Sequence, residues 1–118
     1  MKTYAAMAVL LAASAAPALA EESGADLYQV YCTQCHGVHG NGMGINVHDM
    51  SVQPRVHTDA SAMSARSDEL LFKAIKEGGQ SINKSVLMPP WDGVFSDDEI
   101  HRLVEHMREL CQCRHGTG

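Results

Sequence analysis

The residues of this chain whose types and spacing could do chemistry are the two cysteines and the histidine of Cys32-Thr33-Gln34-Cys35-His36. Two thiols three positions apart can add to the two vinyl groups on one edge of a porphyrin. The histidine that follows can reach an iron ion from one face. Because C-x-x-C-H is the attachment signature of c-type haem, the pentapeptide predicts one covalent haem c, with Cys32 and Cys35 as thioether cysteines and His36 as the proximal iron ligand.

The same cysteines allow other interpretations. C-x-x-C also begins zinc sites and thioredoxin-like redox motifs, and two neighbouring thiols can form a disulfide. A zinc site does not require a histidine directly after the second cysteine, and no βαβ pattern of a thioredoxin fold surrounds the motif. Predicted export also favours haem, because bacterial haem attachment takes place outside the cytoplasm.

Residues 1–20 predict an export signal. Lys2 gives a positive start, residues 4–16 are almost all apolar, and Ala18-Leu19-Ala20 is a typical cleavage site. The apolar run is shorter than the roughly 20 residues that a membrane-spanning helix needs. We therefore expect a cleaved signal peptide over 1–20, no stable membrane insertion, and a soluble periplasmic protein in which residues 21–118 form a single domain.

The charge balance argues against two classes of partner. Without Lys2, eight Lys and Arg residues face 14 Asp and Glu residues. Nucleic-acid binding needs a basic footprint, and an acidic chain is repelled by an anionic membrane surface. We therefore expect no nucleic-acid partner.

Three segments are predicted to be helices, which makes the expected fold class all-α. They are Gly24 to about Cys35, Asp68 to Glu77, and Asp97 to about Leu110. Serines at 23, 67 and 96 supply N-caps, and apolar residues at 100, 103, 104, 107 and 110 form one face of the last segment. The long segment 37–66 has no helical pattern and needs something to organise it; a haem would do so.

An iron held by His36 needs a sixth ligand or keeps an open site. After residue 20, the methionines are Met43, Met50, Met63, Met88 and Met107. Met88 is favoured because Pro89 and Pro90 stiffen its loop, and a rigid loop suits a weak thioether ligand. Met107 is expected in the core. A histidine of the long segment, His39, His48 or His57, would instead give a bis-histidine haem of lower potential.

In the order and spacing of its motifs, the chain resembles the class I cytochromes c of the short bacterial monohaem kind. The likeness rests on the blocks 32–37, 66–70, 88–91 and 96–100 and covers roughly residues 24–110. It implies a small cytochrome c fold, three or more helices packed around one covalent haem, in which the first and last helices cross. Leu27 and Tyr28 would then face Leu103, Val104 and Met107. It also implies His36 and Met88 as the axial pair.

The resemblance implies two further haem-pocket residues. In this family a proline carbonyl often accepts the Nδ1–H of the proximal histidine, and Pro54 is the only proline of the long segment. Such a bond would fix the tautomer of His36. Trp91 is expected beside a haem edge or propionate, where its N–H finds a partner; alternatively it is a loop residue that covers the core.

Cys111 and Cys113 depart from the family pattern. Residues i and i+2 of a helix point to nearly opposite sides, so a bridge between them requires local unwinding. A strained C-x-C disulfide, an intermolecular bridge to a partner or a second copy, and a metal site with His115 are all open. Export favours oxidised over free thiols.

The leading functional hypothesis is an electron carrier rather than an enzyme. It would shuttle single electrons between a redox donor and acceptor that dock transiently, through a His/Met-ligated haem. The alternative is a haem enzyme or gas sensor with a displaceable sixth ligand. A third hypothesis, a zinc or copper protein, would use the four cysteines.

Overall fold

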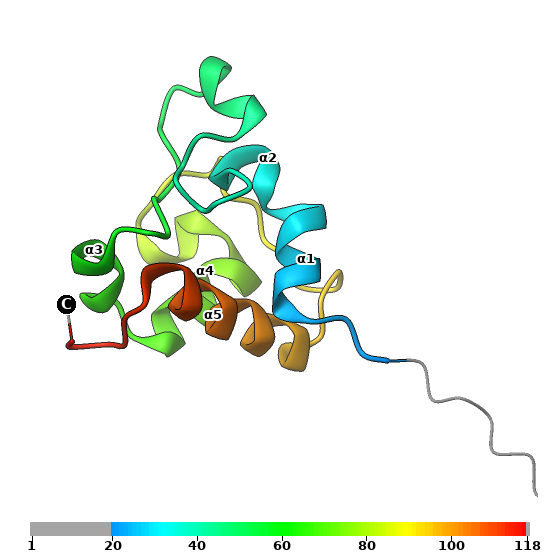
Figure 1. Ribbon diagram of the computed structural model, residues 1–118. Coiled ribbons are helices and arrows are strands. Elements are labelled where there is room, and N and C mark those ends of the chain that lie inside the picture. Colours follow the sequence, from blue (N-terminus) through cyan, green and yellow to red (C-terminus); the bar gives the residue numbers. More distant parts are fainter. Residues whose placement is uncertain (1–19, 118) are drawn as a thin grey trace, which may run out of the picture.

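The computed structural model describes residues 20–117 as five α-helices and two 3₁₀ helices, with no β-strand among these residues (Figure 1). They are α1 (Gly24–Tyr31), α2 (Thr33–His36), η1 (Ile45–Asp49), α3 (Ala60–Ser64), α4 (Asp68–Glu77), η2 (Gly79–Ile82) and α5 (Asp97–Cys111). The expected all-α class is confirmed. Apart from Ala20, the predicted signal peptide lies outside the described residues. Within residues 20–117, no helix has the length and apolar character needed to cross a membrane.

Serine N-caps begin the three longest helices, as predicted. The Ser23 and Ser67 hydroxyls accept the N–H groups of Asp26 and Leu70 at 3.1 and 3.2 Å. At α5 the capping box is reciprocal: Ser96 Oγ accepts the Glu99 N–H at 3.3 Å, and the Glu99 carboxylate accepts the Ser96 N–H at 2.7 Å. These bonds satisfy N–H groups that the first helical turn leaves without partners.

The first predicted helix is in fact two helices. α1 ends at Tyr31, α2 begins at Thr33, and Cys32 lies between them. The Thr33 hydroxyl donates to the Gln29 carbonyl at 2.9 Å, which is the acceptor that the Thr33 N–H of a continuous helix would use. Such back-bonding bends helices, and here it bends the chain where the haem motif begins.

The crossing of α1 and α5 forms the centre of the fold, and Figure 1 shows the two helices side by side. At Gly24 a Cβ atom would lie only 2.0 Å from the Arg102 carbonyl oxygen, so only glycine allows this close approach. Leu27 and Tyr28 are buried in the same core cluster as Leu103, Val104 and Met107, as expected. α4 covers this core from another side and contributes Leu71 and Ile75.

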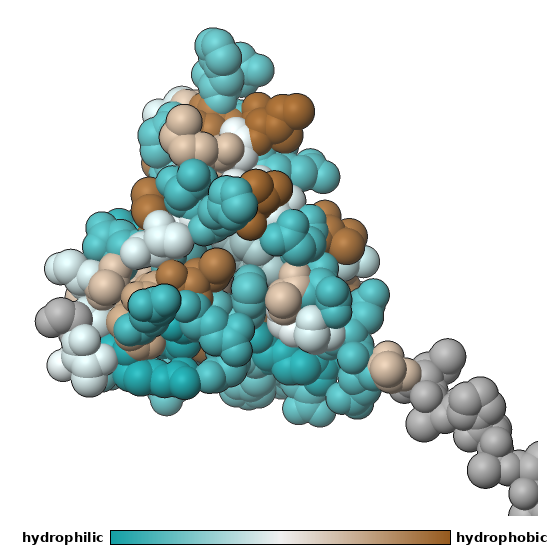
Figure 2. All heavy atoms as spheres, viewed as in Figure 1, coloured by the Kyte–Doolittle hydropathy of each residue, from teal (hydrophilic) through white to brown (hydrophobic). Residues whose placement is uncertain are grey.

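The long segment 37–66 is more ordered than predicted. It contains η1 and α3, and its backbone is tied to the haem motif by bonds from Gly42 N–H to His36 O at 2.8 Å and from Gly44 N–H to Cys35 O at 3.2 Å. η1 rises above α2 (Figure 1), and Figure 2 shows hydrophobic surface in this upper part of the molecule. The exposed apolar side chains there include Met43 and Ile45, which are 73% and 84% exposed.

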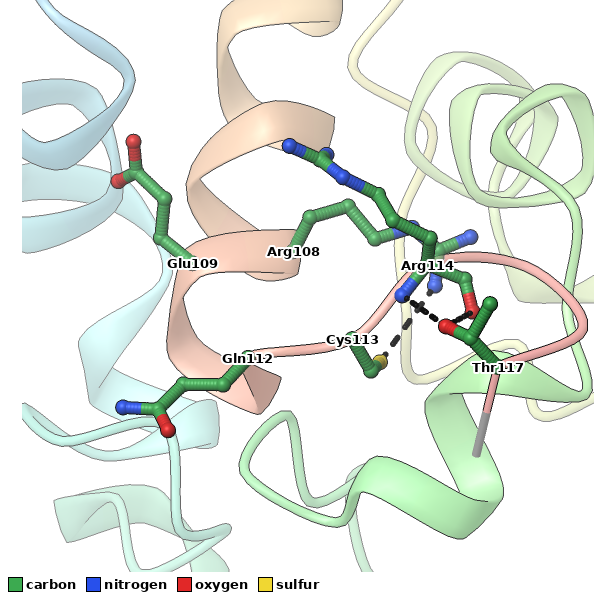
Figure 3. Close-up of a pocket in the computed structure, with 6 residues that line it drawn as sticks. All are labelled: Arg108, Glu109, Gln112, Cys113, Arg114 and Thr117. Atoms are coloured by element: carbon green, nitrogen blue, oxygen red, sulfur yellow. Dashed lines mark hydrogen bonds between the residues drawn. The ribbon is translucent and has the colours of Figure 1, made fainter.

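A buried arginine holds the C-terminal part together. Arg108 is 2% exposed and lies in the buried stripe of α5. Its guanidinium donates to the Asp68 carboxylate at 2.7 Å, to the Met63 carbonyl at 2.9 Å and to the Arg66 carbonyl. One side chain of α5 thereby fixes the end of α3 and the start of α4. Figure 3 shows Arg108 beside Cys113 and the segment that follows α5.

Cys111 and Cys113 form a disulfide with each other. Gln112, between them, has φ of 50°, so the helix unwinds locally as the i, i+2 spacing requires. Both side chains are buried. This pairing corrects two interpretations left open by the sequence: neither cysteine has a free thiol for an intermolecular bridge or for a metal site with His115.

We expect Arg108→Met to lower the free energy of unfolding by about 3 kcal/mol, because one buried and one half-buried carbonyl lose their donor and the Asp68 pair is broken. Urea titration followed by far-ultraviolet circular dichroism measures this. Arg114→Met is the matched control: Arg114 pairs with Glu105 at 2.7 Å, but both side chains are more than half exposed. That variant should lose less than about 1 kcal/mol; equal losses would contradict the role given to Arg108.

The disulfide should matter less than the arginine. For so short a ring the chain-entropy relation gives roughly 1.6 kcal/mol, so the Cys111→Ala/Cys113→Ala double variant should unfold at a higher urea concentration than Arg108→Met. Wild-type protein should run as a monomer on a non-reducing gel, and alkylation without reductant should leave these two cysteines unmodified. A disulfide-linked dimer on that gel would contradict the pairing.

Candidate functional site

A cavity of about 670 Å³ lies beside α1, α2 and α4. Its volume is in the usual range for a cofactor site. Residues far apart in the sequence meet in its wall, and they include every predicted site residue: Cys32, Cys35, His36, Pro54, Met88 and Trp91. Apolar side chains of the helix core form much of the remaining wall, among them Leu71, Ile75, Leu103 and Met107.

The two cysteines of the motif lie one helical turn apart. The N–H groups of Cys35 and His36 both donate to the Cys32 carbonyl, at 3.3 and 2.9 Å, and both thiols are free and half-buried. Burial, with a smaller contribution from Cys35, raises the pKa of Cys32 to about 12. The Cys32 thiol is therefore protonated at neutral pH and is not the reactive thiolate of a thiol oxidoreductase.

The chemistry of His36 is fixed by one hydrogen bond. Its Nδ1 lies 2.9 Å from the Arg55 carbonyl oxygen, which can only accept, so Nδ1 carries the proton. Burial, opposed by this bond, lowers the pKa of His36 and favours the neutral ring. A neutral imidazole protonated at Nδ1 has its lone pair on Nε2, which is the form that binds a metal.

The acceptor of that bond corrects the sequence expectation. Pro54 lines the cavity, but the carbonyl that faces His36 belongs to Arg55, the next residue. Its effect on His36 is the one expected of a proline carbonyl, because any backbone carbonyl at this place fixes the same tautomer.

A second histidine lies against the first. The ring of His57 stacks on that of His36 with 4.1 Å between centroids and 17° between planes. Its Nδ1 is 2.8 Å from the Tyr28 hydroxyl. Two stacked rings share one wall of the cavity, whereas the axial ligands of a haem approach from opposite faces. The structure therefore does not place His57 as a sixth ligand opposite His36.

The loop that carries Met88 is held by its backbone. Met88 N–H donates to Ser85 O at 3.3 Å, and Met88 O accepts the Gly79 N–H at 2.9 Å. A Cβ at Gly79 would lie 2.2 Å from Ser85 O. The glycine after the end of α4 therefore lets the loop that carries Met88 pack closely against this point of the backbone. Met88 itself is half-buried and lines the cavity. The backbone that carries the Met88 thioether is therefore already held in place.

The other methionines divide into two groups. Met50 and Met107 also line the cavity, and Met107 is buried in the core as expected. Met43 is 73% exposed, and Met63 is fully buried in α3 without lining the cavity. The geometry therefore leaves Met50 as the alternative to Met88 that lies outside the helix core.

Trp91 covers the core and lines the cavity at once. Its ring stacks on Phe95, with 5.1 Å between centroids, and meets the edge of Tyr31 at 5.8 Å. The backbone N–H of Trp91 donates to Ile75 O at 3.0 Å, and this bond ties the end of the Met88 loop to α4. Trp91 thus packs over the core and lines the cavity, and its contact with a haem edge or propionate stays a prediction.

Part of the cavity wall is positively charged. Arg55, Asp59 and Arg66 all line it, two cations with one carboxylate. Burial, and then repulsion by Arg55, lowers the pKa of Arg66, while Asp59 raises it. An anionic group bound there would relieve the repulsion between the two guanidinium groups.

Sequence reasoning did not predict the roles that three residues have at this site. Tyr28 lies four and eight positions before Cys32 and His36, and this helical spacing could have placed it beside the motif. For Arg55, only its position next to Pro54 was informative. Nothing local to His57 distinguishes it from the exposed His39 and His48.

An all-α fold, in which a C-x-x-C-H motif and a methionine loop line one cavity, defines a small class I c-type cytochrome. In agreement, residues 19–107 match the family described as "Cytochrome C oxidase, cbb3-type, subunit III", and the chain belongs to that family. Members of c-type cytochrome families carry covalent haem c and transfer electrons to and from redox partners. No curated protein sequence matches the chain.

Two solved structures share the fold. The chain is 28% identical to the KustC0563 c-type cytochrome, with a TM-score of 0.61 over 75% of this chain and 98% of that one. It is 26% identical to a chain of the Kuenenia stuttgartiensis reducing HAO-like protein complex Kustc0457/Kustc0458, with a TM-score of 0.61 over 80% of this chain. It spans only 44% of the second protein.

Proposed function

We propose that this protein is a periplasmic monohaem electron carrier. Cys32 and Cys35 hold the haem c covalently, and His36 and Met88 are its axial ligands. The observation that supports this most is the cavity of about 670 Å³ into whose wall two free thiols, a neutral histidine and a methionine are brought from distant parts of the chain. Bound haem would supply a one-electron centre that cycles between ferric and ferrous iron.

The donor set fits that cofactor. His36 presents Nε2 as the free donor because Nδ1 is bonded to Arg55 O at 2.9 Å. The thiols of Cys32 and Cys35 lie within one turn, so both can reach one edge of a porphyrin. Apolar side chains form much of the remaining cavity wall and, with a thioether ligand, favour the ferrous state. Arg55 and Arg66 are suited to bind the propionates.

The surface beside the motif suits transient docking by a redox protein. Of the 14 acidic residues, only Asp49 and Asp59 fall between positions 27 and 67. The exposed side chains of this stretch include Met43 and Ile45, and Figure 2 shows some hydrophobic surface in the upper part of the molecule. A weakly charged apolar face on an acidic molecule would orient a partner toward the thioether edge, while the small contact area allows rapid release.

The covalent attachment can be tested directly. After boiling in SDS, wild-type protein should retain a haem band with peroxidase activity on the gel, because thioether bonds survive denaturation. The Cys32→Ala/Cys35→Ala double variant should lose that band, and the Cys111→Ala/Cys113→Ala control should keep it. Haem retained by the first variant, or lost by the control, would contradict the assignment.

Met88→Ala should keep its covalent haem but lose the weak far-red band of ferric methionine-ligated haem. Its midpoint potential should fall by about 0.1 V or more, since axial ligands set haem potentials over a range of about 0.8 V. Met50→Ala, the other loop methionine in the cavity wall, is the matched control and should retain both properties. The opposite pattern would move the ligand to Met50.

The same spectra separate a carrier from a haem enzyme or gas sensor. Wild-type ferrous protein should not bind carbon monoxide without denaturant, because Met88 occupies the sixth position on a loop that the backbone holds. A high-spin ferric spectrum, or ready binding of carbon monoxide, would favour the enzyme or sensor instead.

A further inference from the structure

One of the few buried polar side chains among the described residues is the imidazole of His57, which is 6% exposed. It lies face to face with His36 at 4.1 Å. The ring of His57 thus stacks on the residue that we propose as the proximal ligand.

His57 is held at both ends. Its backbone N–H donates to Gly40 O at 2.7 Å, and its Nδ1 pairs with the Tyr28 hydroxyl at 2.8 Å. Tyr28 is itself 1% exposed, meets the His57 ring edge-on at 5.7 Å, and belongs to α1, which packs on α5. The ring of His57 is therefore fixed to the packed helix pair α1 and α5.

Packing alone does not require this pair. Burying an imidazole and a phenol hydroxyl costs free energy that their mutual hydrogen bond only offsets. Two apolar rings could fill the same space without that cost. The pair does supply a flat polar ring, held in one orientation, against the face of His36.

That contact completes the restraint on His36. The bond from Nδ1 to Arg55 O, at 2.9 Å, fixes one atom of the ring but leaves the ring free to tilt about that bond. A second ring stacked at 17° removes this freedom. Together the two contacts define both the direction of Nε2 and the plane of the imidazole.

We propose that His57, fixed by Tyr28, is a positioning residue that sets the plane of the His36 ring, and thereby the electronic state of the haem iron. This inference rests on the proposed function, in which His36 is the proximal ligand. The plane of an axial imidazole decides which iron d orbitals its π electrons meet. A change of plane therefore alters the low-spin ferric ground state without any change of ligand.

The test compares haem-loaded variants by electron paramagnetic resonance of the ferric protein and by the NMR shifts of the haem methyl groups. His57→Leu removes the flat ring and should shift the g values and rearrange the methyl shifts. His57→Phe restores a flat ring and should return both toward wild type. Tyr28→Phe unties His57 and should give a smaller change in the same sense as His57→Leu. His39→Leu, which removes an exposed histidine of the same segment, should change nothing.

The outcomes separate this inference from the function on which it rests. If the wild-type protein itself lacks the far-red band or the covalent haem, the proposed function is contradicted. Wild-type g values in His57→Leu and Tyr28→Phe, with covalent haem and the far-red band intact, overturn only the positioning role, even if the melting temperature falls. If His57→Leu fails to fold, the comparison of Tyr28→Phe with wild type decides: an altered methyl pattern supports the role and an unaltered one refutes it.

Discussion

The contact on which the rest of this structure depends is the close crossing of α1 over α5. Gly24 lies against the Arg102 carbonyl, where any side chain would collide, so the axes of the two helices can approach closely. α1 leads within one residue into the motif that begins at Cys32. Fixing α1 on α5 therefore fixes the two thiols, His36 and, through the same helix, Tyr28. In a small domain, side chains of a site are positioned more precisely when the site directly continues a well-packed helix, as the motif continues α1.

The two walls of the cavity achieve rigidity by different means. Around His36, two contacts hold the side chain itself: the imidazole bonds to the backbone carbonyl of Arg55 and stacks on the ring of His57. Around Met88, the backbone does it, through bonds from Gly79 to Met88 and from Trp91 to Ile75. This difference suits the ligand pair that we propose. An imidazole binds strongly enough to tolerate tuning by its neighbours, whereas a weak thioether needs a loop that is ordered before it binds.

The sequence predicts the parts of the fold that are locally encoded. The serine caps, the apolar stripe of α5 and the glycines after α4 act over a few residues, and the helices begin where the caps place them. α3 and η1 were missed because short helices gain little from propensity and depend on tertiary contacts. Arg108 continues the buried stripe of α5, eight residues after Ile100. Its burial was not predicted because a charged side chain is normally expected on the surface. For the site, C-x-x-C-H and the Met88 loop could be predicted, whereas the stacking of His57 depends on a fold that returns residue 57 to residue 36.

The buried polar groups account for much of what an apolar core alone would leave undefined. Hydrophobic burial is non-directional, so the apolar faces of α1, α4 and α5 could pack with small shifts in register at little cost. Arg108 opposes such shifts between α5 and the α3–α4 junction, since it bonds to three acceptors there, on Met63, Arg66 and Asp68. The Tyr28–His57 pair imposes a similar condition on the other side of the core. An ionised or hydrogen-bonding group that is satisfied in only one arrangement penalises all others by the full desolvation of its atoms. In a domain this small, with a large cavity beside its core, two such groups favour the arrangement in which His36 and Met88 line the same cavity.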